Sequence, residues 1–108
     1  MRLTDDLSTV TLDLHGASVD AAVRAARRAA SVCAARGRHR LALVHGTSTT
    51  TATEAQRPTI KRALHAWADG GSAHGVTATM RGESVLTLVF DLTARRDPRR
   101  LTLRDIAG

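Results

Sequence analysis

The stretch TLDLHG, residues 11–16, has the alternating pattern of a strand that ends in a turn. Its two leucines face one side of the strand, whereas Asp13 and His15 face the other, about 6.6 Å apart along the chain. Its final glycine suits a turn. A strand does not need an aspartate and a histidine on one face for its own stability. This pair is therefore the first candidate for chemistry.

An amphipathic helix and a second strand are predicted to follow. Ser18 can cap the helix, Asp20 lies in the first turn where the helix dipole favours a negative charge, and Gly37 can end it. Small apolar residues recur on one face, while arginines take the other. Residues 41–45 are apolar on both faces, which is typical of a central strand. A helix between two strands predicts a right-handed parallel crossover.

The second half of the chain predicts a loop, a helix and a hairpin. Residues 47–57 are polar and form a long loop for so small a domain. A second helix is expected from Pro58 to Gly70, with Trp67 buried as part of its apolar stripe. Two alternating segments, 76–81 and 86–92, flank a short turn and read as a hairpin.

The predicted fold is an α/β two-layer sandwich with the order strand, helix, strand, helix, strand, strand. Two helices cover one face of a four-stranded mixed sheet, because three of the four strands are apolar on one side only. We expect an N-terminal extension at 1–9, a domain at 10–92 and a basic tail at 93–108 that adds an edge strand at Leu101–Leu103 or stays loose. The open face is expected to carry Thr9, Thr11, Asp13, His15, Thr77, Thr79, Arg81 and Thr87.

The charge of the chain favours a polyanionic partner. The 108 residues carry a net charge of +6, and fifteen of the sixteen basic residues are arginine. Residues 21–62 hold nine basic residues against Glu54 alone. A guanidinium presents paired donors to a phosphate, although a host preference for arginine over lysine explains the composition equally well. A one-signed block of this kind attracts nucleic acid.

Cysteine content and hydropathy bear on the cellular location of the protein. Cys33 is the only cysteine, so no intrachain disulfide can form, and its alanine-rich surroundings predict a buried, unreactive thiol. The sequence shows no segment of eighteen apolar residues and no signal peptide. We therefore expect no membrane partner and a cytoplasmic location.

The element order, with LDLHG at residues 12–16 and His45-Gly46 at the end of the second strand, resembles the Small MutS-related (Smr) domain. The resemblance covers about residues 10–92. Ser48 stands where a second glycine is usual after His45-Gly46, and the glycine-rich turn survives only as Arg81-Gly82-Glu83-Ser84. Residues 59–67, TIKRALHAW, look like the second helix of the family. The resemblance implies an endonuclease or a nucleic-acid-binding module, with Asp13 and His15 tied to cleavage.

The residues support such chemistry independently. Side chains at the carboxyl ends of parallel strands gather at one edge of a sheet, so Asp13, His15 and His45 are expected to converge. One histidine can take a proton from an attacking hydroxyl while the other donates to the leaving oxygen, and Asp13 can orient one ring. Arg81 and the N–H groups of the glycine loops are candidates to hold phosphate charge. We expect His39, His65 and His74 to play no catalytic part.

Three readings of function therefore stand. The first is an endonuclease for RNA or for branched or single-stranded DNA that needs no cofactor; a divalent metal held by the same trio is its alternative. The second is a binding module that holds nucleic acid without cutting it. The third is an adaptor for an acidic protein partner. Ribosomes and repair machinery are candidate larger partners, and the oligomeric state is open. The expected nucleic-acid contacts are Gly16, Gly46, Thr47, Ser48, Lys61, Arg81, Gly82, Arg24, Arg27 and Arg28.

Overall fold

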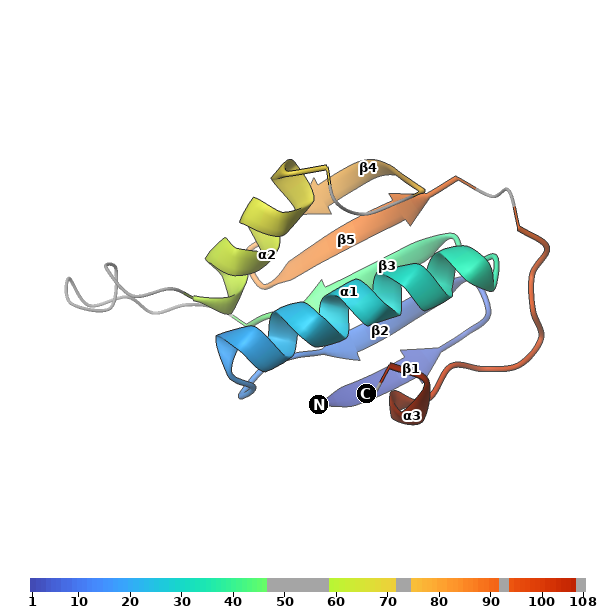
Figure 1. The fold of residues 1–108 in the computed structure, drawn as a ribbon, viewed down its shortest axis with the longest axis horizontal. Helices are drawn as coiled ribbons and strands as arrows, with labels where there is room; N and C mark the ends of the chain where they lie inside the picture. The colour runs from blue at the N-terminus through green and yellow to red at the C-terminus, as the bar shows by residue number, and fades with distance from the viewer. Residues whose placement is uncertain (47–58, 72–74, 92–93, 107–108) are drawn as a thin grey trace.

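A computed structural model describes residues 1–46, 59–71, 75–91 and 94–106. These residues form a mixed sheet covered by helices (Figure 1). The elements are β1 (Arg2–Asp5), β2 (Thr9–Asp13), α1 (Val19–Ala35), β3 (Arg40–Val44), α2 (Ile60–Asp69), β4 (Val76–Arg81), β5 (Val85–Phe90) and α3 (Leu103–Ile106).

The sheet has five strands in the order β1-β2-β3-β5-β4. β2 and β3 are parallel and joined by α1, as the sequence predicted, and every other neighbouring pair is antiparallel. Figure 1 shows α1 lying along β2 and β3, with α2 over β5 on the same side. The two-layer arrangement is therefore confirmed, whereas the prediction of four strands was one too few.

The additional strand, β1, comes from residues expected to form only an N-terminal extension. It pairs with β2 along its whole length, from Arg2 opposite Asp13 to Asp5 opposite Val10. Leu3 packs against the core, which gives this short strand an apolar anchor. A four-residue strand with one inward apolar residue has almost no sequence signal, because its stability depends on its neighbour.

A buried ion pair ties β1 to the C-terminal segment. The Arg38 guanidinium, fully buried, donates to both carboxylate oxygens of Asp5 at 2.9–3.0 Å. Its remaining N–H groups donate to the carbonyls of Arg36, Asp97 and Arg99, and the Leu101 N–H donates to Asp5 at 2.8 Å. We call this network the Asp5–Arg38 clasp. Every partner that it holds comes from the two ends of the chain or from the turn after α1.

The C-terminal segment is consequently part of the fold. Leu101 and Ile106 are buried, and α3 packs against α1. The expected edge strand at Leu101–Leu103 does not form. The segment instead passes β1 and turns into the short helix. The Leu101 N–H donates to Asp5 and the Thr102 N–H donates to Asp105, so neither is available for strand pairing.

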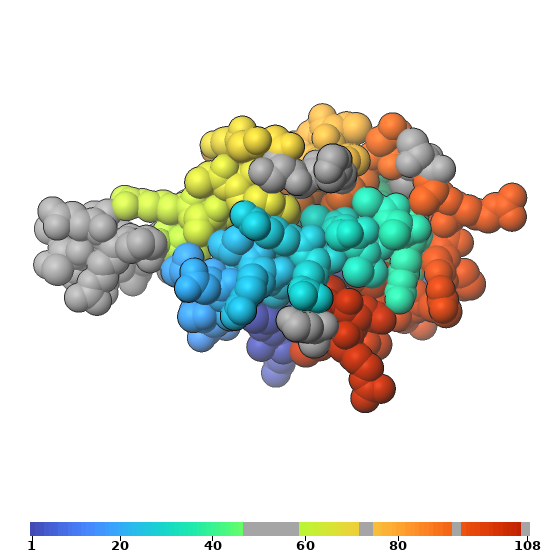
Figure 2. Space-filling model, in the orientation of Figure 1, coloured from blue at the N-terminus to red at the C-terminus, as the bar shows by residue number. Residues whose placement is uncertain are grey.

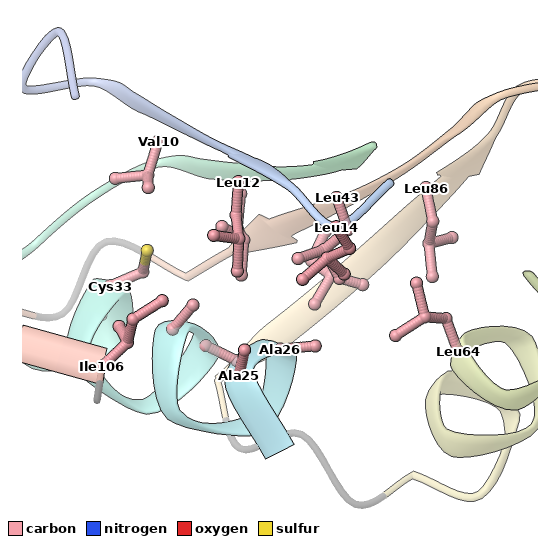
Figure 3. Packing of buried hydrophobic residues seen from close by; sticks show 14 of the residues in the cluster. Val10, Leu12, Leu14, Ala25, Ala26, Cys33, Leu43, Leu64, Leu86 and Ile106 are labelled. Carbon is pink, nitrogen blue, oxygen red and sulfur yellow. The ribbon is translucent and has the colours of Figure 1, made fainter. Parts of the chain in front are cut away.

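The core is small and aliphatic, and α1 contributes mostly alanines to it. Such short side chains allow the helix to lie close to the sheet. Trp67 is only 7% exposed, as predicted, and Cys33 is fully buried. Burial raises the pKa of the Cys33 thiol to about 12, so it stays protonated. Figure 3 shows Val10, Leu12, Leu43 and Leu86 on the strands, with Leu14 directly after β2, facing Ala25, Ala26, Cys33 and Leu64 on the helices.

A bulge in β4 overturns part of the predicted alternation. The register of β4 against β5 shifts between Val76 and Ala78. Beyond it, Thr79 and Arg81 pair with the buried Leu88 and Leu86 and therefore lie on the helix side of the sheet. Met80 instead faces the open side and is 49% exposed. Thr79 and Arg81 are thus not members of the open polar face.

None of the helices formed by the described residues has the length and apolar content needed to cross a bilayer.

Candidate functional site

The candidate site lies at the sheet edge where β2 and β3 both end. Asp13 is in register with Val44, and the Leu14 N–H donates to the Val44 carbonyl at 2.8 Å, which extends the pairing by one step. The N–H groups of His45 and Gly46 then donate to the Ser84 carbonyl at 2.9 and 3.2 Å. His15 and His45 are therefore brought to one edge by parallel pairing, as their sequence positions suggested.

Asp13 fixes the turn after β2 through the main chain. Its Oδ1 accepts a hydrogen bond from the backbone N–H of His15 at 2.9 Å, a side-chain turn typical of aspartate. Gly16 follows with φ of +85°, which a glycine adopts without strain. The sequence suggested that Asp13 orients an imidazole ring. In the structure it positions His15 by holding the backbone that carries the ring.

The exposed ring of His15 lies against the backbone of Gly46. A Cβ built on Gly46 would come within 2.7 Å of the His15 Cδ2, closer than real Cβ contacts approach. Gly46 also has φ of +82°, so both its conformation and its contact require glycine. The His-Gly pair that ends β3 thus provides the surface on which His15 rests.

His45 is 94% buried, being only 6% exposed, and its hydrogen bonding fixes its tautomer. Nδ1 lies 2.8 Å from the Gly46 carbonyl oxygen, which can only accept, so Nδ1 carries a proton. In the neutral ring Nε2 is then a bare acceptor. That atom is buried and has no hydrogen-bond partner among the residues the structure describes.

His65 on α2 is the site residue that the sequence prediction missed. Its half-buried ring meets His45 edge to face, with ring centroids 6.0 Å apart and an interplanar angle of 83°. Its Nε2 is also buried without a partner in the described part of the chain. Burial lowers the pKa of His65, and the positive charges of Arg81, His45 and Lys61 lower it further, while Asp69 opposes them. Lys61 and His65 are four residues apart and therefore share a face of α2, but the contact of His65 with His45 depends on how α2 packs.

Of the groups expected to bind phosphate, some are accessible and others already form hydrogen bonds within the protein. Arg81 is exposed and forms an ion pair with Asp69 at the end of α2. Lys61 is half-buried on the same row of α2 as His65. The N–H groups of Gly46 and Gly82 are already taken by the carbonyls of Ser84 and Val85. These two N–H groups are therefore engaged within the protein, and phosphate contacts at Gly46 and Gly82 stay a prediction. Thr47 and Ser48 lie outside the described residues.

A separate basic surface runs along α1. Arg24, Arg27 and Arg28 are exposed, and within the described ranges none of them has an ion-pair partner. Figure 2 shows α1 crossing the middle of the visible face, with α2 above it and α3 below. Between α1 and α2 lies a groove of about 720 Å³. Its lining includes Arg24, Arg27 and the edge of Trp67.

The described part of the chain contains no group of three or more His, Cys, Asp or Glu side chains placed to hold a metal ion. Asp13, His15 and His45 share an edge, but they do not converge as a preformed set of ligands. The donor set that the structure does assemble is made of imidazoles and cationic groups. This chemistry suits an anion better than a cation.

Comparisons with known proteins agree with this fold. The family model of the Smr domain matches residues 12–84. The crystal structure of the Smr domain of Thermus thermophilus MutS2 aligns with a TM-score of 0.56 at 21% sequence identity, covering 75% of this chain and 96% of that chain. The search of curated proteins found no match. The family match includes Asp13, His15, His45 and His65, whereas β1 and the C-terminal segment of the clasp lie outside it.

Proposed function

The chain belongs to the Smr domain family, and from the geometry of its site we propose that it is an endonuclease. The substrate class is RNA, or branched or single-stranded DNA, and the bond cut is the phosphodiester. The observation that carries the proposal is the seating of His15: its solvent-exposed imidazole rests on Gly46 and is held by Asp13 through the backbone. A general acid or base needs this combination of access and fixed position.

The two histidines at the edge suit different steps. His15 is exposed, so it can take a proton from an attacking hydroxyl and return it to water. His45 keeps a proton on Nδ1, and a second proton on Nε2 converts it into an imidazolium. In that form it can neutralise the phosphate charge and donate to the leaving oxygen. Because its Nε2 is buried in the free protein, the substrate must displace the groups that cover it.

The three exposed arginines of α1 supply the affinity in this proposal. Arg24 and Arg27 line the α1–α2 groove, and Arg28 lies on the side of α1 that faces α3. All three are exposed and can contact phosphates without reading sequence. Such contacts position the nucleic-acid strand but take no part in cleavage. In this proposal α1 therefore binds the substrate, and the residues at the ends of β2 and β3 cut it.

The second candidate is a binding module that does not cut. The N–H groups of Gly46 and Gly82 already donate to backbone carbonyls. They are therefore not available to stabilise the negative charge that develops in a transition state. Both candidates bind nucleic acid, and cleavage is what separates them.

The test is incubation of the protein with end-labelled RNA and DNA, with and without a chelator. Acid–base chemistry through the 2′-hydroxyl predicts cuts in RNA that survive chelation and vanish when a single 2′-deoxy nucleotide replaces the nucleotide at the cut. If chelation abolishes cutting and a divalent ion restores it, the proposed chemistry is wrong. If the nucleic acid binds and stays intact in every arm, the binding module is the correct reading.

A further inference from the structure

Two buried imidazole nitrogens in contacting rings have no hydrogen-bond partner in the part of the chain that the structure describes. Buried polar atoms in native proteins almost always have a hydrogen-bond partner, and each exception calls for an explanation. His45 Nε2 and His65 Nε2 are both such exceptions within the described residues. Their rings are in edge-to-face contact, with centroids 6.0 Å apart, so both atoms lie in the same region, between α2 and the end of β3. A ligand bound there could give both atoms a hydrogen-bond partner.

The charges around this location are mostly positive. The titratable groups that face His65 are Lys61 and Asp69 on α2, His45 at the end of β3, and Arg81 on β4. Asp69 is the one acid among them, and it is committed to Arg81. That ion pair is exposed on both sides, and exposed pairs are weak, so Arg81 can exchange Asp69 for a stronger acceptor.

We propose that His45, His65 and Arg81 form a binding position for a phosphate group of the nucleic-acid strand, and that the phosphate enters together with a proton. This inference rests on the proposed function and deepens it, because it adds His65 as a substrate-binding residue. The proton follows from the hydrogen bond of His45. Nδ1 already donates to Gly46, so Nε2 can donate to a phosphate oxygen only when the ring is charged.

The free and bound states then differ in protonation. In the free protein burial first, and then the surrounding cations, disfavour a charged His65 ring and lower its pKa. A phosphate reverses the balance, because its negative charge favours imidazolium on either ring and its oxygens accept from both Nε2–H groups. Affinity therefore rises as the pH falls, until the free rings are themselves protonated.

Inorganic phosphate is the first probe, followed by NMR of the histidine ring nitrogens across a pH series. Phosphate should move the titrations of His45 and His65 to higher pH while leaving His39, at the far end of β3, unchanged. His65→Gln should weaken phosphate binding roughly tenfold, the value of one charge-assisted hydrogen bond, and flatten its pH dependence. His39→Gln is the matched control and should change neither.

Asp69→Asn gives an independent variant that retains both rings. It frees Arg81 and removes the one acid that faces His65 among the described residues, so phosphate should bind more tightly. Asp91→Asn removes the same charge from the exposed end of β5 and should have little effect. The inference is overturned if the two rings titrate identically with and without phosphate, or if affinity is independent of pH.

An all-deoxy oligonucleotide, which cleavage through the 2′-hydroxyl would leave intact, identifies the source of the phosphate. It should shift the same two rings at a lower concentration than inorganic phosphate does, because the arginines of α1 add contacts. If free phosphate shifts the rings but the oligonucleotide does not, the position belongs to a small phosphate ligand and the inference is wrong. Ring shifts without RNA cleavage would refute the endonuclease alone, and cleavage without ring shifts would refute this inference alone.

Discussion

At the scale of single residues, each group at the sheet edge is placed by the backbone of another. Asp13 holds the main chain of His15, Gly46 supports the ring of His15, and His45 is held by the Gly46 carbonyl. The sequence predicted that these residues converge, because parallel strands bring their carboxyl ends together. It could not predict that Asp13 acts on backbone or that His65 reaches His45, since both depend on turn geometry and helix packing.

Gly46→Ala should displace His15 and slow cleavage on the order of a hundredfold, the usual cost of misplacing a reacting group by about 1 Å. The new Cβ would collide with His15 Cδ2 at 2.7 Å. Gly71→Ala is the matched control: it introduces similar strain at φ of +69°, but its Cβ would meet open space. Each change should cost about 1–2 kcal/mol in urea unfolding. Only Gly46→Ala should move the NMR signals of the His15 ring; equal signals in both variants would show that the contact does not position His15.

At the scale of elements, α1 and α2 have separate tasks. The apolar face of α1 packs on the sheet, which leaves its arginines toward solvent, and this division was predictable from helical spacing. The five-stranded sheet and the β4 bulge were not. β1 has a single inward apolar residue, and the bulge moves Thr79 and Arg81 to the other face without any change in the alternating sequence.

Replacing Arg24, Arg27 and Arg28 together by glutamine should weaken nucleic-acid binding and flatten its salt dependence. Each lost phosphate contact removes roughly 0.7–0.9 from the log–log slope against salt. The control removes the same charge from exposed arginines on three other elements, β1, β3 and α3: Arg2, Arg40 and Arg104. Fluorescence anisotropy at several salt concentrations measures both variants. If both variants lose the same affinity and the same salt dependence, the net charge of the protein, and not the surface of α1, attracts the nucleic acid.

Trp67→Ala should destabilise the protein by about 3–5 kcal/mol, because it removes a large buried side chain where α2 meets α1. Met80→Ala, at a half-exposed position on the open face, should cost within about 0.5 kcal/mol. Urea unfolding followed by circular dichroism compares the two variants. A similar loss for both would contradict the packing described for α2.

At the scale of the whole molecule, the two ends of the chain are structural parts of the domain. The Asp5–Arg38 clasp joins β1, the turn after α1 and the segment before α3. No local sequence pattern predicts this clasp, because an aspartate near the N-terminus and an arginine after a helix are typical of surface charges. They become buried partners only when β1 pairs with β2, which is why the ends were expected to lie outside the fold.

Asp5→Asn should cost about 3–5 kcal/mol at neutral pH, since it leaves the buried Arg38 charge unpaired. Burial alone would raise the pKa of Asp5, but hydrogen bonds from Arg38, Leu101 and Leu7 lower it below its ordinary value of 3.8. The stabilisation is therefore full above that value and is lost as the pH falls through the folded-state pKa. The gap between wild type and Asp5→Asn should shrink on acidification in urea unfolding, whereas the exposed Asp91→Asn should show little gap at any pH. A gap that grows in acid would contradict the clasp.

The most direct test of the proposed cleavage site is single-turnover cleavage of an end-labelled RNA. It compares wild type with Asp13→Ala, His15→Ala and the double variant. Each single variant should fold and bind like wild type, yet cut about 10²–10⁴ times more slowly. The double variant should lose less than the product of the two, because Asp13 acts by positioning His15. His39→Ala, at the opposite end of β3, should cut normally. A folded, RNA-bound His15→Ala that cuts at the wild-type rate would contradict the assignment, as would unfolding of both single variants, which would make the pair structural.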